Sequence, residues 1–465
     1  MAAFERLTHE DARILGLEEG SVRGHTCKVL VTGAAPGGAR IGLDELREHV
    51  ERRLGRVPRL RQRLATTPLG IADPIWVDDD EFDVARHVTL TPGRGPVGRE
   101  RLRAIVGELM STRLDPARPL WRIDLVDSLE EGGAVVVVRL HHCMADGTAS
   151  VRILSQILLD DEAAPVDPPH EQWSPTAAPH AVRLAALGLR DRAGAAAATA
   201  GEAARALVSP AAWAASARTV GRLPATLRRE LDARSADSAL AAPIGPRRVV
   251  AFHAAPLDEV KRIGKAVGEG VTVNDVVLAA VGGGLRRLLG DADTGAAGLR
   301  VKVPVSLHGR DDAAGTLANR DSFMFVDLPV GEQDPVERLL AINRETSDRK
   351  RHHDAETLDA LFRDLSHVSH SLERLANRWA MSPRVFTLNV SNVPGPRGPS
   401  FVMGAPLHEA YSLAEVANRH ALRASVFSAA GNLAFGFCAD ADAVNDLDPM
   451  AAGVADELET LRARI

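Results

Sequence analysis

The sequence predicts an α/β protein of two domains joined by a helical connector, and three observations support this prediction. The chain has 465 residues, which is too long for one compact core and suits two domains of ordinary size. Strand-like and helix-like stretches alternate in the first third of the chain and again in its second half. A segment rich in Pro and then in Ala separates them. We therefore expect domains at residues 1–160 and 241–465, with the connector at 161–240.

The first segment combines strand patterns with two helical periods. Apolar residues between 98 and 114 recur at helical spacing, and the stretch 149–160 repeats that period. Short apolar, β-branched runs predict strands at 25–31 and 134–140, and a further strand begins with Pro119, Leu120 and Trp121.

The connector begins with an acidic, Pro-rich stretch at 161–179, which predicts an exposed linker. An Ala-dominated stretch with interleaved Arg follows, and Ala favours helix. Two interpretations stay open. The helix either ties the domains together or rests on a membrane surface through an amphipathic face that carries Arg183, Arg190 and Arg192. Because Ala is a poor membrane anchor, the first interpretation is favoured.

The last segment again alternates between helical and strand patterns of apolar residues. Thr272 is placed to cap the first of its predicted helices, with Asp275 in the first turn. The predicted helices lie at 271–290, at 335–353 and at the end of the chain, and the predicted strands at 300–307, 322–330, 385–395 and 433–440.

Composition excludes several classes of protein. The net charge of −6 comes without a concentrated basic face, so nucleic acid is not an expected partner. The three cysteines are widely spaced and form no CxxC pair, so neither a disulfide framework nor a zinc site is expected. The N-terminus lacks the apolar region of a signal peptide, and no window of 18 apolar residues exists. We expect a cytoplasmic protein without a metal.

The strand at 134–140 runs into an HHxxxDG motif made of His141, His142, Asp146 and Gly147. Neighbouring side chains of a strand point to opposite faces, so the two histidines are poorly placed to share one metal ion. One of them can act as a general base, since imidazole titrates near neutral pH. Asp146 can brace the turn by pairing with an Arg or by accepting backbone N–H bonds. A core histidine with satisfied hydrogen bonds is the alternative for either ring.

No nucleophilic residue accompanies the motif. The chain has no Ser in a GxSxG turn, and nothing in the sequence supports Cys143 as a nucleophile. A covalent intermediate is therefore not expected.

Three further motifs accompany HHxxxDG: PLW at 119–121 precedes it, and ND at Asn274 and Asp275 and NVPGP at 392–396 follow it. With them the chain resembles the bacterial wax ester synthase/acyl-CoA:diacylglycerol acyltransferase family, among the CoA-dependent acyltransferases that carry HHxxxDG. The resemblance extends over nearly the whole chain and is weakest in the connector.

This resemblance implies two chloramphenicol-acetyltransferase-like domains with a tunnel at their interface. The implied enzyme moves a fatty acyl group from acyl-CoA to diacylglycerol or a long-chain alcohol, giving triacylglycerol or wax ester without an acyl-enzyme. Acyl-CoA is a co-substrate, and no other cofactor is implied. The implied catalytic residues are His142 as base, Asp146 as brace and Asn274. The residues placed at the substrate site are His141, Gly147, Pro119, Leu120, Trp121 and Asp275.

The residues themselves leave some of these roles open. Trp121 is either core or channel wall. Capping alone accounts for Asp275, whereas Asn274 either belongs to the same cap or points its amide at the substrate or oxyanion. The rigidity of a turn alone accounts for NVPGP.

Two departures bear on the specificity of the enzyme. The family often has an Arg soon after VPVS, whereas this chain has His308 there and Arg310 two residues later. Whether an Arg pairs with Asp146 in this chain therefore stays open. Ser428 and Ala429 stand where a family Ser-Tyr pair is expected. Acceptor preference, acyl chain length and oligomeric state do not follow from the sequence.

Two rival functions use the same motif or fold. Condensation domains of peptide synthetases carry HHxxxDG but join carrier-bound groups, and their motif usually has Ser where this chain has Ala149. A lipid-binding protein of this fold without catalysis is the second rival. Because the expected substrates are long and apolar, we expect peripheral contact with the inner membrane or with lipid droplets.

Overall fold

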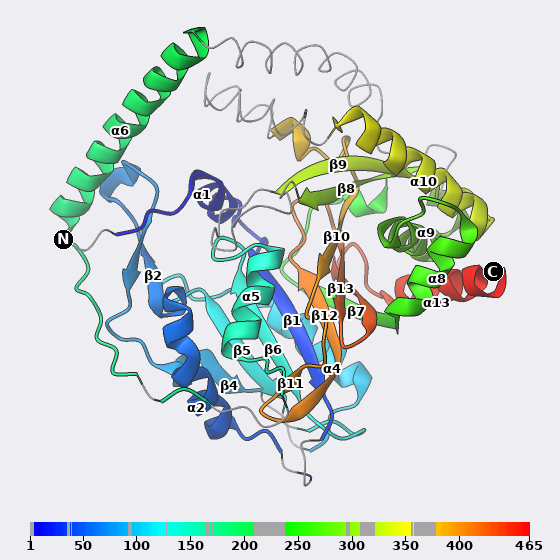
Figure 1. The fold of residues 1–465 in the computed structure, drawn as a ribbon, viewed down its shortest axis with the longest axis horizontal. Coiled ribbons are helices and arrows are strands. Elements are labelled where there is room, and N and C mark those ends of the chain that lie inside the picture. Colours follow the sequence, from blue (N-terminus) through cyan, green and yellow to red (C-terminus); the bar gives the residue numbers. More distant parts are fainter. Residues whose placement is uncertain are drawn as a thin grey trace.

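The computed structural model shows two α/β bodies packed against each other, with one long helix projecting from them (Figure 1). The α/β class predicted from the sequence is confirmed. The structure describes residues 4–34, 38, 40–91, 95–126, 128–162, 167–169, 171–208, 238–293, 298–306, 321–354, 357 and 378–465.

The first body is built on a six-stranded sheet with the strand order β11-β12-β1-β6-β5-β4. Neighbouring strands are antiparallel except β4 and β5. Every residue of the central strands β1 and β6 is buried, as expected for a sheet that is covered on both faces. The strands are β1 (His25–Thr32), β4 (Val88–Leu90), β5 (Trp121–Val126), β6 (Val135–His141), β11 (Phe401–Val402) and β12 (Ala405–Ala414).

Helices cover both faces of this sheet. The α2 and α5 helices pack on the side of Leu30 and Val136, and α4 packs on the side of Val29 and Val137. A two-stranded ladder, β2 (Gln62–Ala65) with β3 (Ile75–Asp78), lies beside it. The helices are α1 (His9–Gly16), α2 (Leu43–Arg53), α3 (Val84–His87), α4 (Arg99–Ser111) and α5 (Gly147–Ile157), with 3-10 turns η2 (Leu54–Arg56), η3 (Pro58–Arg61) and η4 (Pro68–Gly70).

The second body has a sheet of order β7-β14-β13-β10-β8-β9, in which β10 runs parallel to both of its neighbours. Its core is the main apolar cluster between this sheet and its helices. The elements are β7 (Arg248–Pro256), β8 (Leu299–Ser306), β9 (Asp321–Leu328), β10 (Leu388–Pro394), β13 (Leu422–Ala429), β14 (Asn432–Asp440), α8 (Leu257–Val267), α9 (Val273–Asp293), α10 (Pro335–His352), α13 (Asp448–Ala463) and the 3-10 turn η5 (Ala239–Ala241).

Glycines allow α9 and α13 to pack closely. A Cβ on Gly453 of α13 would lie 2.8 Å from the Cα of Gly284 on α9, and one on Gly284 would meet the carbonyl of Met450. Figure 1 shows these two helices side by side on the outer face of the second sheet.

The first sheet draws its edge from the C-terminal part of the chain. β12 pairs with β1 in an antiparallel ladder that places Ser412 opposite Lys28, and β11 follows it. This ladder satisfies backbone groups that would otherwise form an open sheet edge. The expected boundaries at residues 160 and 241 stay a prediction, but residues 401–414 belong spatially to the first sheet.

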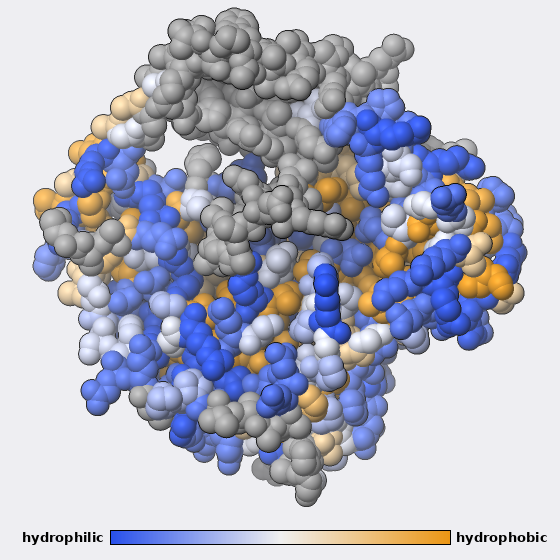
Figure 2. Space-filling model, viewed as in Figure 1, coloured by the Kyte–Doolittle hydropathy of each residue, from blue (hydrophilic) through white to orange (hydrophobic). Residues whose placement is uncertain are grey.

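The predicted connector helix is present as α6 (Ala181–Val208), which projects beyond the two bodies (Figure 1). Leu184 anchors it against Ile75 and Val77, whereas Val182 and Leu189 are 84% and 60% exposed. Apolar colouring is visible along this helix in Figure 2. The remainder of the predicted Ala-rich stretch, from 209, lies outside the described residues. No helix in the described part of the chain is both long and apolar enough to cross a bilayer.

Candidate active site

The two histidines of the motif occupy different environments at the end of β6. His141 is the last residue of the strand, is fully buried, and donates its backbone N–H to the carbonyl of Leu120 at 2.9 Å. His142 follows the strand, is partly exposed, and donates its backbone N–H to the carbonyl of Gly24 at 2.8 Å. The two side chains therefore differ in burial, and which of them faces the substrate stays a prediction.

The ring of His141 is held by its neighbours. Its Nδ1 accepts the backbone N–H of Cys143 at 3.1 Å and lies 2.9 Å from the Cys143 Sγ. Its Nε2 lies 3.4 Å from a carboxylate oxygen of Glu18. These contacts are those of a supporting residue, and the placement of His141 at the substrate site stays a prediction.

His142 has the properties of a neutral base. Burial, followed by the positive charge of Arg423, lowers the pKa of the His142 imidazole to about 4. Its Nδ1 is buried and has no hydrogen-bond partner among the described residues. The ring is therefore uncharged at neutral pH and able to accept a proton.

Asp146 braces the turn through the backbone. It is the N-cap of α5, and its Oδ1 accepts the N–H of Ala149 at 2.6 Å. Of the two contacts expected from the sequence, an Arg partner or a backbone N–H, the structure shows the backbone N–H. Among the described residues no Arg lies within 4 Å of the Asp146 carboxylate. His308 and Arg310, which raised the question of an Arg partner, lie outside the described residues.

Gly147 brings the motif into contact with the second sheet. A Cβ on Gly147 would lie 2.8 Å from Cγ2 of Val393, which belongs to the NVPGP motif at the end of β10. Two motifs that are far apart in the sequence therefore meet where the bodies join.

The PLW motif supports the same strand end. The carbonyl of Leu120 pairs with His141, and the indole Nε1 of Trp121 donates to the carbonyl of Leu60 at 2.7 Å. Trp121 also stacks on His87, with ring centroids 4.5 Å apart. Pro119, Leu120 and Trp121 are all buried, as the core interpretation of Trp121 requires. Their roles at the substrate site stay predictions.

The ND motif divides into a capping residue and a residue with an available amide. The Asp275 N–H donates to Oγ1 of Thr272 at 3.3 Å, which confirms the predicted cap by Thr272, and the Asp275 carboxylate accepts bonds from the N–H and Oγ1 of Thr272, each at 2.8 Å. It also accepts bonds from Asn343 and Thr346 of α10. Asn274 is partly exposed, and no side-chain hydrogen bond is found for it among the described residues. A role for Asn274 toward the substrate stays a prediction.

Cys143, beside the histidines, is buried, and burial raises the pKa of its thiol well above the usual range. It is therefore a protonated thiol and a poor nucleophile. Within the described residues no group of three or more His, Cys, Asp or Glu side chains is arranged to hold a metal ion.

Sequence reasoning missed a polar row on the second sheet, formed by Lys302 of β8, Asn389 of β10 and Arg423 of β13, which we call the cation row. The available signal was a Lys and an Arg inside strands that are largely apolar. The charge of Arg423 contributes to the low pKa of His142, so this end of the row acts on the candidate base.

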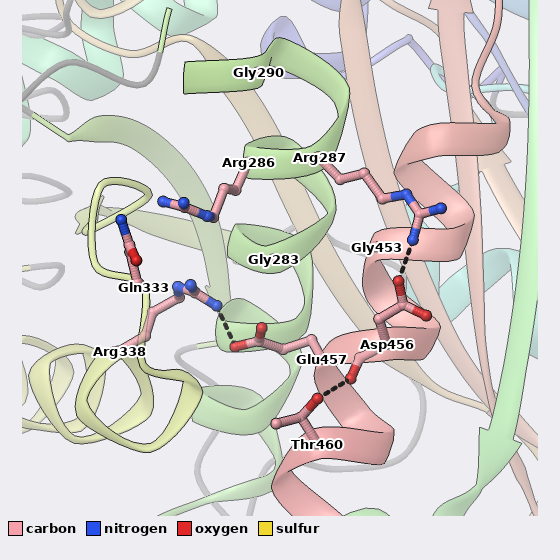
Figure 3. A pocket seen from close by; sticks show the side chains of 10 residues that line it. All are labelled: Gly283, Arg286, Arg287, Gly290, Gln333, Arg338, Gly453, Asp456, Glu457 and Thr460. Atoms are coloured by element: carbon pink, nitrogen blue, oxygen red, sulfur yellow. Dashed lines mark hydrogen bonds and ion pairs between the residues drawn. The ribbon is translucent and has the colours of Figure 1, made fainter. Parts of the chain in front are cut away.

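A separate hollow of about 310 Å³ opens between α9, α10 and α13 (Figure 3). Its charges are largely paired with one another: Arg338 lies 2.5 Å from Glu457, and Arg287 pairs with Asp456. None of the predicted site residues lines this hollow, so we do not assign it to the reaction. It is lined by Gly283, Arg286, Arg287, Gly290, Gln333, Arg338, Gly453, Asp456, Glu457 and Thr460.

Comparison with family models gives two matches. Residues 7–277 match the wax ester synthase/diacylglycerol acyltransferase catalytic domain, and residues 317–462 match the C-terminal domain of the same family. A protein of Mycobacterium tuberculosis named as a diacylglycerol O-acyltransferase is 31% identical over 99% of this chain and 90% of its own length. A second such protein from the same organism is 30% identical over 88% of this chain and 86% of its own length.

Solved structures show the same fold. The wax ester synthase/diacylglycerol acyltransferase of Marinobacter aquaeolei matches with a TM-score of 0.67 at 21% identity, covering 99% of both chains. The first condensation domain of the calcium-dependent antibiotic synthetase matches with a TM-score of 0.59 at 17% identity, covering 99% of this chain and 96% of that one. The predicted pair of chloramphenicol-acetyltransferase-like domains is confirmed by these likenesses.

Proposed function

The chain belongs to the wax ester synthase/diacylglycerol acyltransferase family and is an acyltransferase, and we propose that it transfers a fatty acyl group from acyl-CoA to the hydroxyl of diacylglycerol or a long-chain alcohol. The products would be triacylglycerol or wax ester. The observation that carries this proposal is the neutral, partly exposed imidazole of His142 at the junction of the two bodies.

In the proposed reaction His142 is the only proton carrier. Because Nδ1 is buried, Nε2 takes the proton of the acceptor hydroxyl as its oxygen attacks the thioester carbonyl carbon. The tetrahedral intermediate then breaks its C–S bond, and the imidazolium returns the proton to the CoA sulfur. The amide of Asn274 is the proposed donor to the oxyanion.

Direct transfer fits the chemistry of the neighbouring residues better than an acyl-enzyme. The Cys143 thiol is held protonated, and its Sγ lies against the ring of His141 rather than that of the base. Asp146 contributes by capping α5, which fixes the turn that carries His142.

The test offers purified protein two donors, palmitoyl-CoA and a palmitoyl-carrier protein, each with hexadecanol or dioleoylglycerol. Mass spectrometry measures the ester product, and a thiol assay measures free CoA. We expect ester with palmitoyl-CoA. Ester formed only from the carrier-bound donor would favour a condensation-type enzyme, and absence of product with every pair would favour a lipid-binding protein without catalysis.

We also propose that the protein contacts a membrane or lipid-droplet surface through the exposed face of α6. Val182, Ala186 and Leu189 follow one another at helical spacing and face solvent to differing degrees, with Arg183 and Arg190 exposed beside them. Leu184 occupies the opposite, packed face. This surface would keep the enzyme close to acceptors that are insoluble in water.

A further inference from the structure

We propose that Glu18 is a positioning residue for the reaction and acts on His142 through the ring of His141. Its carboxylate keeps the imidazole proton of His141 on Nε2, and Nδ1 of the same ring then holds the turn that follows β6. The inference rests on the proposed function, because it concerns the placement of the base in that reaction. It assigns a separate task to the first histidine of the HHxxxDG motif.

The contacts of His141 determine which of its two nitrogens carries the proton. Nδ1 accepts the backbone N–H of Cys143 at 3.1 Å, so this nitrogen presents a lone pair. The Cys143 Sγ lies 2.9 Å from the same nitrogen, and because burial raises the pKa of the thiol, this group is a second donor. The proton of the neutral ring is therefore on Nε2.

Glu18 lies on the Nε2 side of the ring. Its Oε2 is 3.4 Å from Nε2 of His141, and its Oε1 is 3.0 Å from Nε of Arg113. A carboxylate only accepts hydrogen bonds. With the proton on Nδ1, the lone pair of Nε2 would face this carboxylate, and the Nδ1 proton would face the N–H of Cys143. Both sides of the ring therefore favour the same tautomer.

The segment that carries Glu18 is itself fixed to the first body. Arg113, which follows α4, contacts the Glu18 carboxylate and also donates through Nη2 to the carbonyl of Gly20 at 3.3 Å. The same segment continues to Gly24, whose carbonyl accepts the backbone N–H of His142. One short stretch before β1 therefore reaches both histidines of the motif, one through a side chain and the other through the backbone.

The turn after β6 depends on the bond from Nδ1. Its three successive N–H groups are all satisfied: that of His142 by Gly24, that of Cys143 by the ring of His141, and that of Met144 by the carbonyl of His141 at 2.9 Å. A ring with its proton on Nδ1 would leave the N–H of the buried Cys143 without an acceptor. The turn would then shift, and with it the base, and small displacements of a reacting group lower the rate strongly.

An ion pair that serves only stability is the alternative for Glu18. The Arg113 side chain is 43% exposed, whereas that of Glu18 is 14% exposed and contacts a fully buried ring. Ion pairs with such an exposed partner add little to stability. Removal of the carboxylate should therefore affect the rate of the reaction more than the stability of the fold.

Steady-state kinetics with palmitoyl-CoA and hexadecanol test this. Glu18→Ala should lower kcat by about 10- to 100-fold, the effect of a misplaced reacting group. The KM values for both substrates should stay within about twofold, because no substrate contact is removed. Glu18→Gln keeps one acceptor oxygen and should lose less. Glu19→Ala, which removes an exposed carboxylate from the neighbouring residue, should leave kcat unchanged.

His141→Asn assigns the effect to the ring of His141. The side-chain oxygen of an Asn accepts the N–H two residues further on, as Nδ1 does here, and it needs no partner to fix a tautomer. In the His141→Asn background, Glu18→Ala should therefore lower kcat by less than about threefold. Should Glu18→Ala not fold, Glu18→Gln replaces it in the same comparison.

NMR of protein that carries ¹⁵N-labelled histidine determines the tautomer without reference to activity. In the wild type we expect the proton of His141 on Nε2, and in Glu18→Ala a mixture of the two tautomers. The spectrum of His141→Asn identifies the signal of this ring by its loss.

Several results would overturn the inference. An equal loss of kcat from Glu18→Ala in both backgrounds would show that Glu18 does not act through His141. A loss confined to the melting temperature or to KM would make Glu18 a structural residue or a substrate contact. A proton on Nδ1 of His141 in the wild type would remove the proposed role of the carboxylate. If the wild type forms no ester, the proposed function fails and the role in catalysis fails with it, whereas the NMR comparison still shows whether Glu18 sets the tautomer.

Discussion

The Cα of Gly24 lies against the imidazole of His141, so that a Cβ on Gly24 would be 3.1 Å from Cε1 of that ring and closer still to Nε2. Gly24 also has a φ of +68°, and its carbonyl accepts the N–H of His142. One glycine outside the motif therefore holds both histidines in place.

Replacement of Gly24 by Ala should destabilise the protein and disturb the active site together. A left-handed backbone costs a non-glycine residue about 1–2 kcal/mol, and the clash with the ring adds about 1–3 kcal/mol. We expect a loss of about 2–5 kcal/mol in the free energy of unfolding, measured by urea denaturation, and reduced ester formation.

Gly20→Ala is the matched control. Gly20 has a φ of +56°, and no atom lies within 4 Å of a Cβ added there. It should therefore lose only about 1–2 kcal/mol. Equal losses of unfolding free energy in the two variants would show that the contact between Gly24 and His141 does not affect stability.

Asp146 should act as a helix cap whose charge adds little to stability. Asp146→Ala removes the acceptor of the Ala149 N–H and should cost about 1–2 kcal/mol, with a lower melting temperature and lower activity. Asp146→Asn keeps a capping oxygen and should cost less than about 1 kcal/mol. An unchanged melting temperature in Asp146→Ala would contradict the bracing role.

His142→Ala should abolish ester formation while the protein stays folded. The loss of a general base lowers kcat by about 100- to 10,000-fold. Product formation measured by mass spectrometry, with circular dichroism as the control for folding, checks this. Turnover at the wild-type rate in the variant would remove His142 from the mechanism.

The local parts of this site could be predicted from the sequence. The strand that ends beside the two histidines and the cap that Thr272 makes on the helix of Asp275 could be predicted, because both depend only on residues close in the chain. The α6 helix followed in the same way from its Ala content.

The missed parts depend on contacts between distant segments. The pattern of apolar residues predicts a strand but not the sheet that the strand joins. The pairing of β12 with β1 was therefore not predicted. The cation row needs the register of three strands, at residues 302, 389 and 423, that are distant in sequence. The approach of Gly24 to His141 is likewise a contact across more than 100 residues.

The pH dependence of the reaction should report the charge of Arg423. The base must be uncharged, and with the pKa of His142 near 4 we expect kcat/KM to vary little between pH 5 and pH 8 in the wild type. In Arg423→Gln the protonated imidazole is no longer disfavoured by that charge, so the pKa of His142 should rise, but only in part, because burial is the larger cause of its low value and remains. The loss of activity toward acid should therefore begin at a higher pH than in the wild type.

A pH–rate profile with hexadecanol checks this prediction, because this acceptor does not itself titrate. Lys265→Met provides a control with the same loss of one positive charge at a distant, exposed site. An acid limb in the same place in Arg423→Gln and the wild type would show that Arg423 does not act on the base.

Binding to anionic vesicles should depend on the exposed face of α6. Arg183→Gln and Arg190→Gln should each weaken binding about fivefold, since a basic side chain near such a surface contributes about 1 kcal/mol. Arg192→Gln is the control, because this side chain donates to the carbonyl of Ile71 at 3.0 Å. Flotation with phosphatidylglycerol vesicles measures the bound fraction. If the first two variants float as well as the wild type, α6 serves only to connect the two domains.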